Sequence, residues 1–395
     1  MAAVFSLQPY RALVVTPDLA AAVLASVIGR LPIGITGFAI LLYVQAETRS
    51  FATAGALSAI YVLGLAAAAP FLGRLIDRAG PRRVLTVSAI VHPAMLVSLI
   101  ALVSRDASLG LTVLCAAGAG ASLPPITVCM RALYPQLVGD EKLLHTAYSL
   151  DAALIEAVFI LGPMVVSVFA ALDSSQSAIA LAAICATTGS FLFLRSSAVR
   201  RWKTDVAEHP RGLLGPLRHP ALLVLFLVTL LNASAFGLIE VAITGLATMQ
   251  GYTAAAGVIL GLASVGTTLG VLIYGSRSWW PPLARQFFYA LLLMASGILL
   301  IAPIQNLVLL ACVIVIAAAP TSVALAITSL LISKLAPRAM LAESFTWMAT
   351  FLLTGISLGI AGGGVLVEAA SPFAALILAS ALAAFAALLV RLRLN

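Results

Sequence analysis

The segment "GRLIDRAGPRRVL", residues 73–85, gathers four Arg and one Asp between two long apolar runs. These runs, at roughly 51–73 and 84–104, are each long enough to cross ~30 Å of hydrocarbon as a helix. Gly80-Pro81 is a dipeptide typical of turns, and bases in so short a connection favour one side of a membrane. We therefore interpret the segment as a tight loop between two membrane-spanning helices.

The composition of the whole chain supports this interpretation. Of its 395 residues, 62% are hydrophobic and only 9% are charged, and the mean hydropathy is +1.14. A soluble domain is roughly 45–50% apolar and about 25% charged, so the charges here are too few to cover a water-facing surface. The sequence predicts an all-α polytopic membrane protein with twelve transmembrane helices. The apolar runs lie at roughly 17–43, 51–73, 84–104, 108–130, 143–172, 177–195, 220–248, 254–275, 286–304, 307–333, 340–367 and 372–391.

The 22 Lys and Arg residues are divided unequally between the two sides that these spans define. With residue 1 inside, only Arg49 and Arg105 fall outside and Arg30 falls within a span, which leaves 19 on the inner side. Cytoplasmic loops carry such an excess of positive charge. We therefore expect a multi-pass protein of the cell's inner (plasma) membrane with both termini in the cytoplasm. The net charge of +8 then sets the topology and requires no nucleic-acid partner.

The longest polar stretch between spans, residues 195–220, falls between the sixth and seventh spans. Six spans, a linker and six more spans are what an internal duplication leaves. We therefore expect an N-terminal six-helix bundle over 1–196, a cytoplasmic linker over 197–219 and a C-terminal six-helix bundle over 220–395.

A direct comparison of the two halves supports the duplication. Residues 143–162 and 340–359 align without a gap at an offset of 197. Aromatic, hydroxyl and glycine positions then coincide: Tyr148 with Phe345, Ser149 with Thr346, and Gly162 with Gly359. The two carboxylates of the first segment have no counterpart in the second, so folding of the repeat does not require them.

The loop quoted above resembles the signature loop of the major facilitator superfamily. That signature runs Gly, three residues, Asp, a base, one residue, Gly and then further bases. The matching positions are Gly73, Asp77, Arg78, Gly80, Arg82 and Arg83. With twelve spans, a central linker and inside termini, the resemblance covers the whole chain.

The resemblance implies two pseudo-symmetric six-helix bundles that rock about a central site and open it alternately to each side. We therefore expect a secondary transporter and not an enzyme. Asp77 would act as a cytoplasmic latch, pairing with basic residues and helix ends of the other half, in spans eight and eleven, when the site faces outward. The equivalent loop of the second half keeps Gly275 and Arg277 but lacks the acid, so we expect a one-sided latch.

Among the ionisable side chains within spans, four are candidates for the transport site: Arg30, Asp151, Glu156 and Glu240. Such charges cost a few kcal/mol in hydrocarbon and are functional candidates by default. At ~1.5 Å per residue, Arg30 and Glu156 both lie about 20 Å from the start of their spans, near the midplane. Two interpretations stay open: a buried ion pair that orients the helices, or a proton carried by Glu156 with Arg30 tuning it or binding substrate. Asp151 is roughly 140° round the helix from Glu156, so the two cannot share a face.

The resemblance also implies that spans one, four, seven and ten line the cavity, which adds Glu240 and Asn232 of span seven. Glu240 is interpreted either as a second proton or cation site or as a satisfied polar residue near the outer interface. Gly162-Pro163 in span five resembles the core of an antiporter motif, although its flanking glycines are missing. The Arg of a second antiporter motif would fall at Leu114, and its absence leaves Arg30 as the substitute.

The available lining is apolar and aromatic, with hydroxyls, and includes Tyr61, Tyr148 and Trp347. We therefore expect proton-coupled efflux of a small hydrophobic or amphipathic compound by a monomer. The alternative is proton-coupled symport of a small carboxylate or amino acid, with Arg30 as the anion anchor. The four His residues are isolated from one another, so we expect no metal centre and no cofactor, and a membrane enzyme or a sensor is disfavoured.

Overall fold

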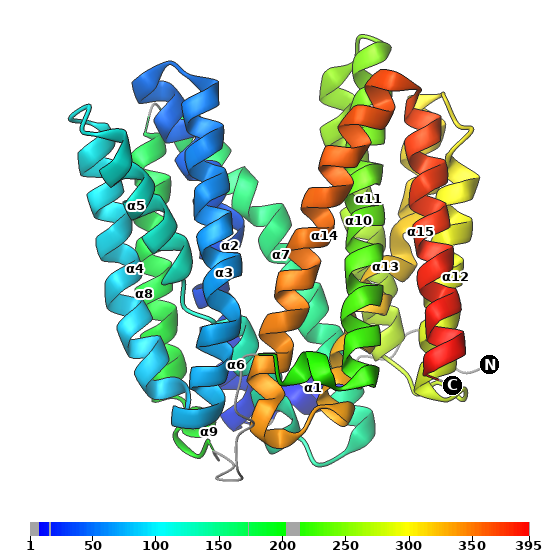
Figure 1. The fold of residues 1–395 in the computed structure, drawn as a ribbon. Helices are drawn as coiled ribbons and strands as arrows, with labels where there is room; N and C mark the ends of the chain where they lie inside the picture. Colours follow the sequence, from blue (N-terminus) through cyan, green and yellow to red (C-terminus); the bar gives the residue numbers. More distant parts are fainter. Residues whose placement is uncertain (1–7, 16, 173, 203–213, 395) are drawn as a thin grey trace.

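The computed structural model describes residues 8–15, 17–172, 174–202 and 214–394. All regular structure in these ranges is helical (Figure 1). The helices of the first half are α1 (Gln8–Val15), α2 (Pro17–Thr48), α3 (Phe51–Ala79), α4 (Pro81–Val103), α5 (Leu109–Ala121), α6 (Ile126–Leu137), α7 (Glu141–Ala171), α8 (Ser175–Arg195) and α9 (Ser197–Arg200). Those of the second half are η1 (Pro216–Arg218), α10 (Pro220–Met249), α11 (Thr253–Gly275), α12 (Leu283–Ile301), α13 (Leu307–Leu335), η2 (Arg338–Met340), α14 (Leu341–Ala369) and α15 (Pro372–Arg393). Part of the expected linker, 203–213, lies outside the described residues.

Twelve helices within the described residues are long and apolar enough to cross a membrane. This confirms the twelve spans expected from the hydropathy of the sequence. The expected loop at 73–85 is shorter than we inferred, because α3 continues to Ala79 and α4 begins at Pro81. Gly80 alone joins the two helices, with a φ of 75° that only glycine adopts at little cost, and Pro81 starts α4 without needing an N–H partner.

The fourth span is broken into two helices. Pro124 and Pro125 provide no backbone N–H, so the ladder of α5 cannot continue into α6. At the last turn of α5 the backbone N–H and the hydroxyl of Ser122 both donate to the Gly118 carbonyl, at 3.0 and 2.6 Å. The span then continues to Leu137 instead of ending near residue 130. Arg131, which we counted as a cytoplasmic charge, therefore lies inside the span and is buried.

The helices are arranged in two groups, α2–α8 and α10–α15 (Figure 1). In the first group α2 packs against α8, α7 and α3, and in the second α10 packs against α14 and α15. Small residues allow close approach, as is usual between helices in lipid. A Cβ at Gly162 would lie 2.4 Å from the Gly34 carbonyl, so the Gly162-Pro163 dipeptide lies where α7 crosses α2.

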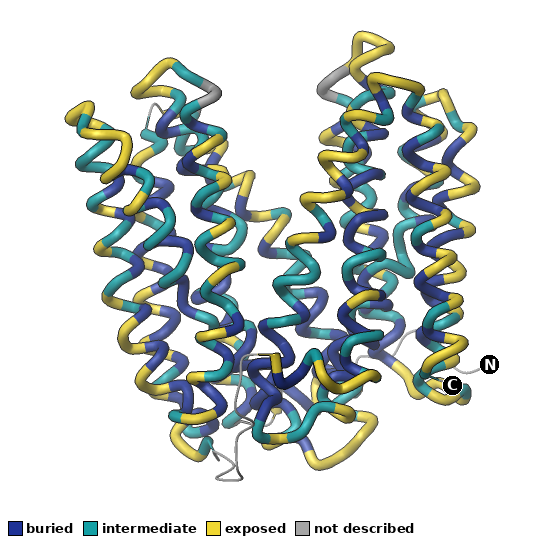
Figure 2. Tube along the Cα trace, in the orientation of Figure 1, coloured by how far each residue is buried: buried dark blue, intermediate teal, exposed yellow. Residues whose placement is uncertain are grey.

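The two groups meet at one end of the molecule and diverge toward the other (Figure 1). They meet at the end that carries α1 and the last turn of α15, which we call the closed end. There α3, α6 and α7 contact α11, α13 and α14. Buried residues are dense between the groups at this end (Figure 2).

Candidate functional site

The first half encloses a buried cluster of three charged side chains. Asp151 of α7 accepts from Nη2 of Arg30 in α2 at 2.6 Å and from Nε of Arg131 in α6 at 2.7 Å. Relative exposures of the three side chains are 1%, 0% and 8%. The Tyr134 hydroxyl lies 3.4 Å from the same carboxylate. The broken fourth span makes this cluster possible, because α6 carries Arg131 to the level of Asp151.

The cluster has two positive charges for one negative charge. Among the described residues, Nε and Nη1 of Arg30 are buried without a hydrogen-bond partner. A buried charge without compensation costs several kcal/mol, so the cluster is a region of unsatisfied positive potential inside the span.

Of the two interpretations left open for Arg30 and Glu156, the ion pair between them is not formed, since Arg30 pairs with Asp151 instead. Depth along the helix placed Arg30 level with Glu156 and placed Asp151 nearer the cytoplasmic end, but the direction in which each acid points decides the partner. Asp151 points toward α2 and α6 of its own half. Glu156, five residues further along α7, points toward the second half, as the helical spacing requires.

Glu156 is at the contact between the two halves. Its Oε1 accepts a hydrogen bond from the hydroxyl of Ser322 in α13. Just below it, toward the closed end, small apolar side chains of both halves are buried together: Ala152, Ala153, Val271 and Ala326. Within the described part of the chain, no Lys, Arg or His makes an ion pair with Glu156. A carboxylate without a basic partner is therefore positioned where the halves separate.

The latch candidate Asp77 binds the start of α14. Its Oδ1 accepts from the backbone N–H of Ala342 at 2.9 Å and its Oδ2 from that of Glu343 at 2.7 Å. The first N–H groups of a helix lack partners within the helix and carry a partial positive charge. Asp77, which is 7% exposed, therefore joins the first half to the second by capping a helix. Arg78, Arg82 and Arg83 of the same motif are exposed.

Replacing Asp77 by Asn removes the charge from this cap. We expect the conformation with this end closed to be destabilised by about 1–2 kcal/mol relative to the open one. The ratio of closed to open populations then falls about 5–30-fold. Distances between spin labels at Arg200 and Arg338, one on each half, measure the change. Asp140→Asn is the control, because Asp140 caps α7 at the Lys142 N–H within its own half. Equal distance distributions in Asp77→Asn and Asp140→Asn would contradict the role of Asp77.

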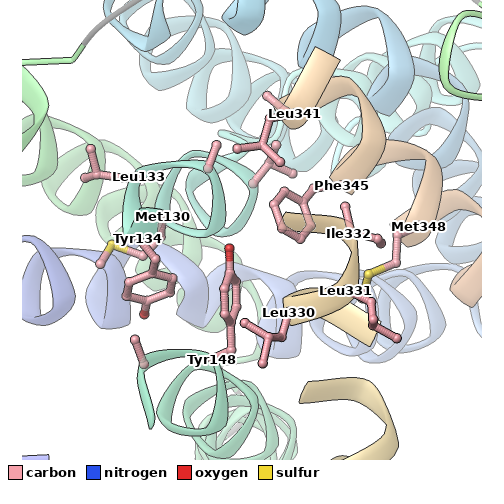
Figure 3. Close-up of a cluster of buried hydrophobic side chains, with 14 of the residues drawn as sticks. Met130, Leu133, Tyr134, Tyr148, Leu330, Leu331, Ile332, Leu341, Phe345 and Met348 are labelled. Atoms are coloured by element: carbon pink, nitrogen blue, oxygen red, sulfur yellow. The ribbon is translucent and has the colours of Figure 1, made fainter. Parts of the chain in front are cut away.

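A hydrophobic plug fills the closed end between the halves (Figure 3). Its side chains come from α6 and α7 on one side and from α13 and α14 on the other, and the close-up labels Met130, Leu133, Tyr134, Tyr148, Leu330, Leu331, Ile332, Leu341, Phe345 and Met348. Tyr148, which we expected in the cavity lining, is 1% exposed in this plug, 6.2 Å from Phe345 between ring centroids. Its hydroxyl donates to the Arg131 carbonyl at 2.9 Å.

Two related helix crossings border the plug. Gly73 of α3 lies against Thr346 of α14, and Gly275 of α11 lies against Ser149 of α7. Ser149 and Thr346 are equivalent in the alignment of the halves, so the crossings repeat one arrangement. At the second crossing, where the acid is missing, the Thr146 hydroxyl donates to the Gly275 carbonyl at 2.8 Å.

Helix α1 also takes part in this second crossing. The hydroxyl of Tyr10 donates to the Leu272 carbonyl of α11 at 2.7 Å, and Tyr10 and Leu13 are buried. Burial raises the pKa of the Tyr10 phenol above its usual value, so it stays a neutral donor. Helix α1 thus binds the second half on the side where the latch acid is absent.

Tyr10→Phe removes this donor, and we expect the closed conformation to be destabilised by about 1 kcal/mol relative to the open one. The population ratio should fall about fivefold, less than in Asp77→Asn, as measured with the same spin labels. The matched control is Tyr252→Phe, which removes a hydroxyl from a tyrosine that is 67% exposed at the far end. If Tyr10→Phe and Tyr252→Phe gave the same distances, α1 would have no part in closure.

The remaining predicted site residues lie apart from the charged cluster. Within the described residues, the Glu240 carboxylate in α10 makes no hydrogen bond or ion pair, and Oδ1 of Asn232 on the same helix is buried without a partner. Tyr61 is 3% exposed in the core of the first half. Trp347 packs beside Phe351 with ring centroids 6.2 Å apart.

Sequence reasoning missed three contributors: Arg131, Ser322 and Tyr10. The Pro124-Pro125 pair could have indicated that the fourth span continues past a break and encloses Arg131. Nothing local marks Ser322 or Tyr10, because their partners are 166 and 262 residues away.

Comparison with known proteins gives the family. A profile described as the Major Facilitator Superfamily matches residues 22–317, whereas no curated protein matches the sequence. Similar solved structures include a bacterial homologue of the iron transporter ferroportin in an outward-facing state, with a TM-score of 0.79, 14% identity, and coverage of 94% of this chain and 98% of that chain. The human organic anion transporter MFSD10 (TETRAN) follows with a TM-score of 0.74, 15% identity, and coverage of 95% and 99%. The E. coli fucose:proton symporter has a TM-score of 0.71, 12% identity, and coverage of 96% and 99%.

At these identities the three structures show likeness of fold alone. The profile match, which spans most of the chain, agrees with the twelve spans and the two groups of helices. The chain therefore belongs to the major facilitator superfamily and is a multi-pass membrane transporter, not an enzyme.

Proposed function

We propose that this transporter exports a small hydrophobic or amphipathic compound in exchange for protons. The excess of basic residues near the closed end supports an orientation with that end in the cytoplasm. The conformation described here would then face outward from the inner membrane. The units 1–196 and 220–395, joined by the linker 197–219, would rock as two bodies within a monomer.

The observation that carries the proposal is the position of Glu156. It is embedded near the middle of α7, has no ion pair among the described residues, and accepts from Ser322 across the contact between the halves. In the outward-facing state a proton that enters from outside would neutralise the carboxylate and weaken its preference for the Ser322 hydroxyl. The halves then rearrange, the proton leaves Glu156 for the cytoplasm, and substrate enters the inward-open site for export.

A second candidate, symport of a small carboxylate, has one observation in its favour. The cluster of Arg30, Arg131 and Asp151 carries an excess positive charge with unpartnered N–H groups on Arg30. Against it, Arg30 is 0% exposed and already bound by Asp151 while the molecule faces outward. An anion anchor should be accessible in that state, so we favour export.

Proteoliposomes that contain a pH dye test both candidates. They are challenged in turn with lipophilic cations, neutral lipophilic compounds and small carboxylates. Export predicts that a lipophilic compound drives protons in the opposite direction. Carboxylate movement together with protons, with no response to lipophilic compounds, would instead establish the symporter.

A further inference from the structure

A cavity lies away from the contact between the halves. It has a volume of about 620 Å³ and lies between the first turns of α12 and the last turn of α15, at the closed end. Two guanidinium groups line it, those of Arg285 and Arg391, together with the rings of Phe288 and Tyr289. None of the latch, plug or cluster residues lines this cavity, so the transport site does not explain it.

The cavity lies at the ends of two membrane-spanning helices, where lipid headgroups would surround it. Helix α12 begins at Leu283 and α15 ends at Arg393, so both basic residues are within three residues of a span end. The preceding loop carries Trp279 and Trp280, which are 41% and 99% exposed, and tryptophan favours the membrane–water interface. Helices α12 and α15 form the outer edge of the second half, far from the first half (Figure 1). The cavity therefore faces the surrounding bilayer.

We propose that this cavity binds the phosphate-bearing headgroup of an anionic phospholipid. Two guanidinium groups suit a phosphate, which each can bind through paired N–H donors. Arg391 lies over the Phe288 ring, 5.7 Å from its centroid, and this contact orients its guanidinium. No Asp or Glu is among the described residues that line the cavity. The aromatic rings contact the glycerol and upper acyl region, which a free phosphate lacks, so we assign the ligand to lipid.

A bound headgroup would also stabilise the contact between the two halves at the closed end. Gln286, next to Arg285, accepts from the Tyr274 hydroxyl at 2.5 Å and donates to the Pro281 carbonyl at 2.6 Å. Tyr274 in turn packs against His145 of the first half, with ring centroids 4.3 Å apart. The turn that holds Arg285 therefore also holds the loop between α11 and α12 against α7. Anionic lipid should favour the conformation in which this end is closed, and this expectation does not depend on the substrate or the coupling ion.

Native mass spectrometry of the full chain tests the site. The protein is mixed with phosphatidylglycerol or phosphatidylcholine, and retained lipid is counted for wild type and for Arg285→Gln with Arg391→Gln. We expect preferential retention of phosphatidylglycerol, reduced on the order of tenfold in the double variant. Arg195→Gln is the matched control, since Arg195 lies over Phe191 at 4.2 Å near the same membrane surface but does not line this cavity.

Equal losses in the double variant and in Arg195→Gln would overturn the site. A separate arm adds inorganic phosphate or glycerol phosphate to wild type. Binding of soluble phosphate without preference for phosphatidylglycerol over phosphatidylcholine would overturn the assignment to lipid. If the double variant failed to fold, Arg391→Gln alone would decide, because an exposed Arg at a helix end can be replaced without leaving a buried charge.

Discussion

Proton flux driven by substrate is lost in Glu156→Gln, while the protein still folds and still binds substrate. Gln keeps the size of the side chain and an oxygen that accepts from the Ser322 hydroxyl. It cannot bind or release a proton, so the variant resembles the neutral form of Glu156 at every pH. We expect pH-driven transport to fall at least about a hundredfold, the lower range for loss of a proton-transferring side chain. Exchange of substrate for substrate without a pH gradient should persist.

Two matched variants test whether this loss comes from the proton that Glu156 carries. Ser322→Ala removes the hydrogen bond that Glu156 accepts from α13 but no titratable group, so it should alter the rate and leave the ratio of protons to substrate unchanged. Glu240→Gln removes a second embedded carboxylate, which makes no hydrogen bond or ion pair within the described residues, and it should leave coupling intact. Loss of coupling in Glu240→Gln but not in Glu156→Gln would move the proton site to α10. Unchanged coupling in both would refute proton exchange by either carboxylate.

The twelve spans could be predicted from the sequence because each depends on local hydropathy alone. The loop motif likewise indicated Asp77. The motif directly follows an apolar run, which is why Asp77 lies in the last turn of α3. The direction of Asp151 relative to Glu156 also follows from helical geometry. What these features share is that they depend on residues close together in the sequence.

The partners in the site could not be predicted in the same way. Depth along the spans matched Arg30 with Glu156, whereas Arg30 pairs with Asp151, because Asp151 points toward α2 and Glu156 points toward the second half. Arg131 looked like a charge at the end of a span, and only the break at Pro124-Pro125 brings it inside. The contacts of Tyr10 depend on how two halves meet, which no local pattern encodes.

Stability falls sharply in Asp151→Asn and only slightly in Arg30→Gln. Within the described ranges, Asp151 is the one acid that pairs with the two buried guanidinium groups, at 2.6 and 2.7 Å. Without it, Arg30 and Arg131 would face each other as like charges in a low-dielectric interior, at a cost of about 3–5 kcal/mol. Removing Arg30 instead leaves Arg131 and Asp151 as a balanced pair. Thermal stability of the purified protein in detergent measures the two variants side by side.

The asymmetry between these variants tests the excess charge itself. In an ordinary ion pair, loss of either partner leaves one unpaired charge and the two costs are similar. In this cluster the starting charge is positive, so losing the acid increases the imbalance and losing Arg30 removes it. Equal destabilisation by Asp151→Asn and Arg30→Gln would mean that another group already compensates the cluster. If Arg30→Gln is stable but no longer transports carboxylates that the wild type moves, Arg30 binds the substrate. The protein would then be a carboxylate symporter.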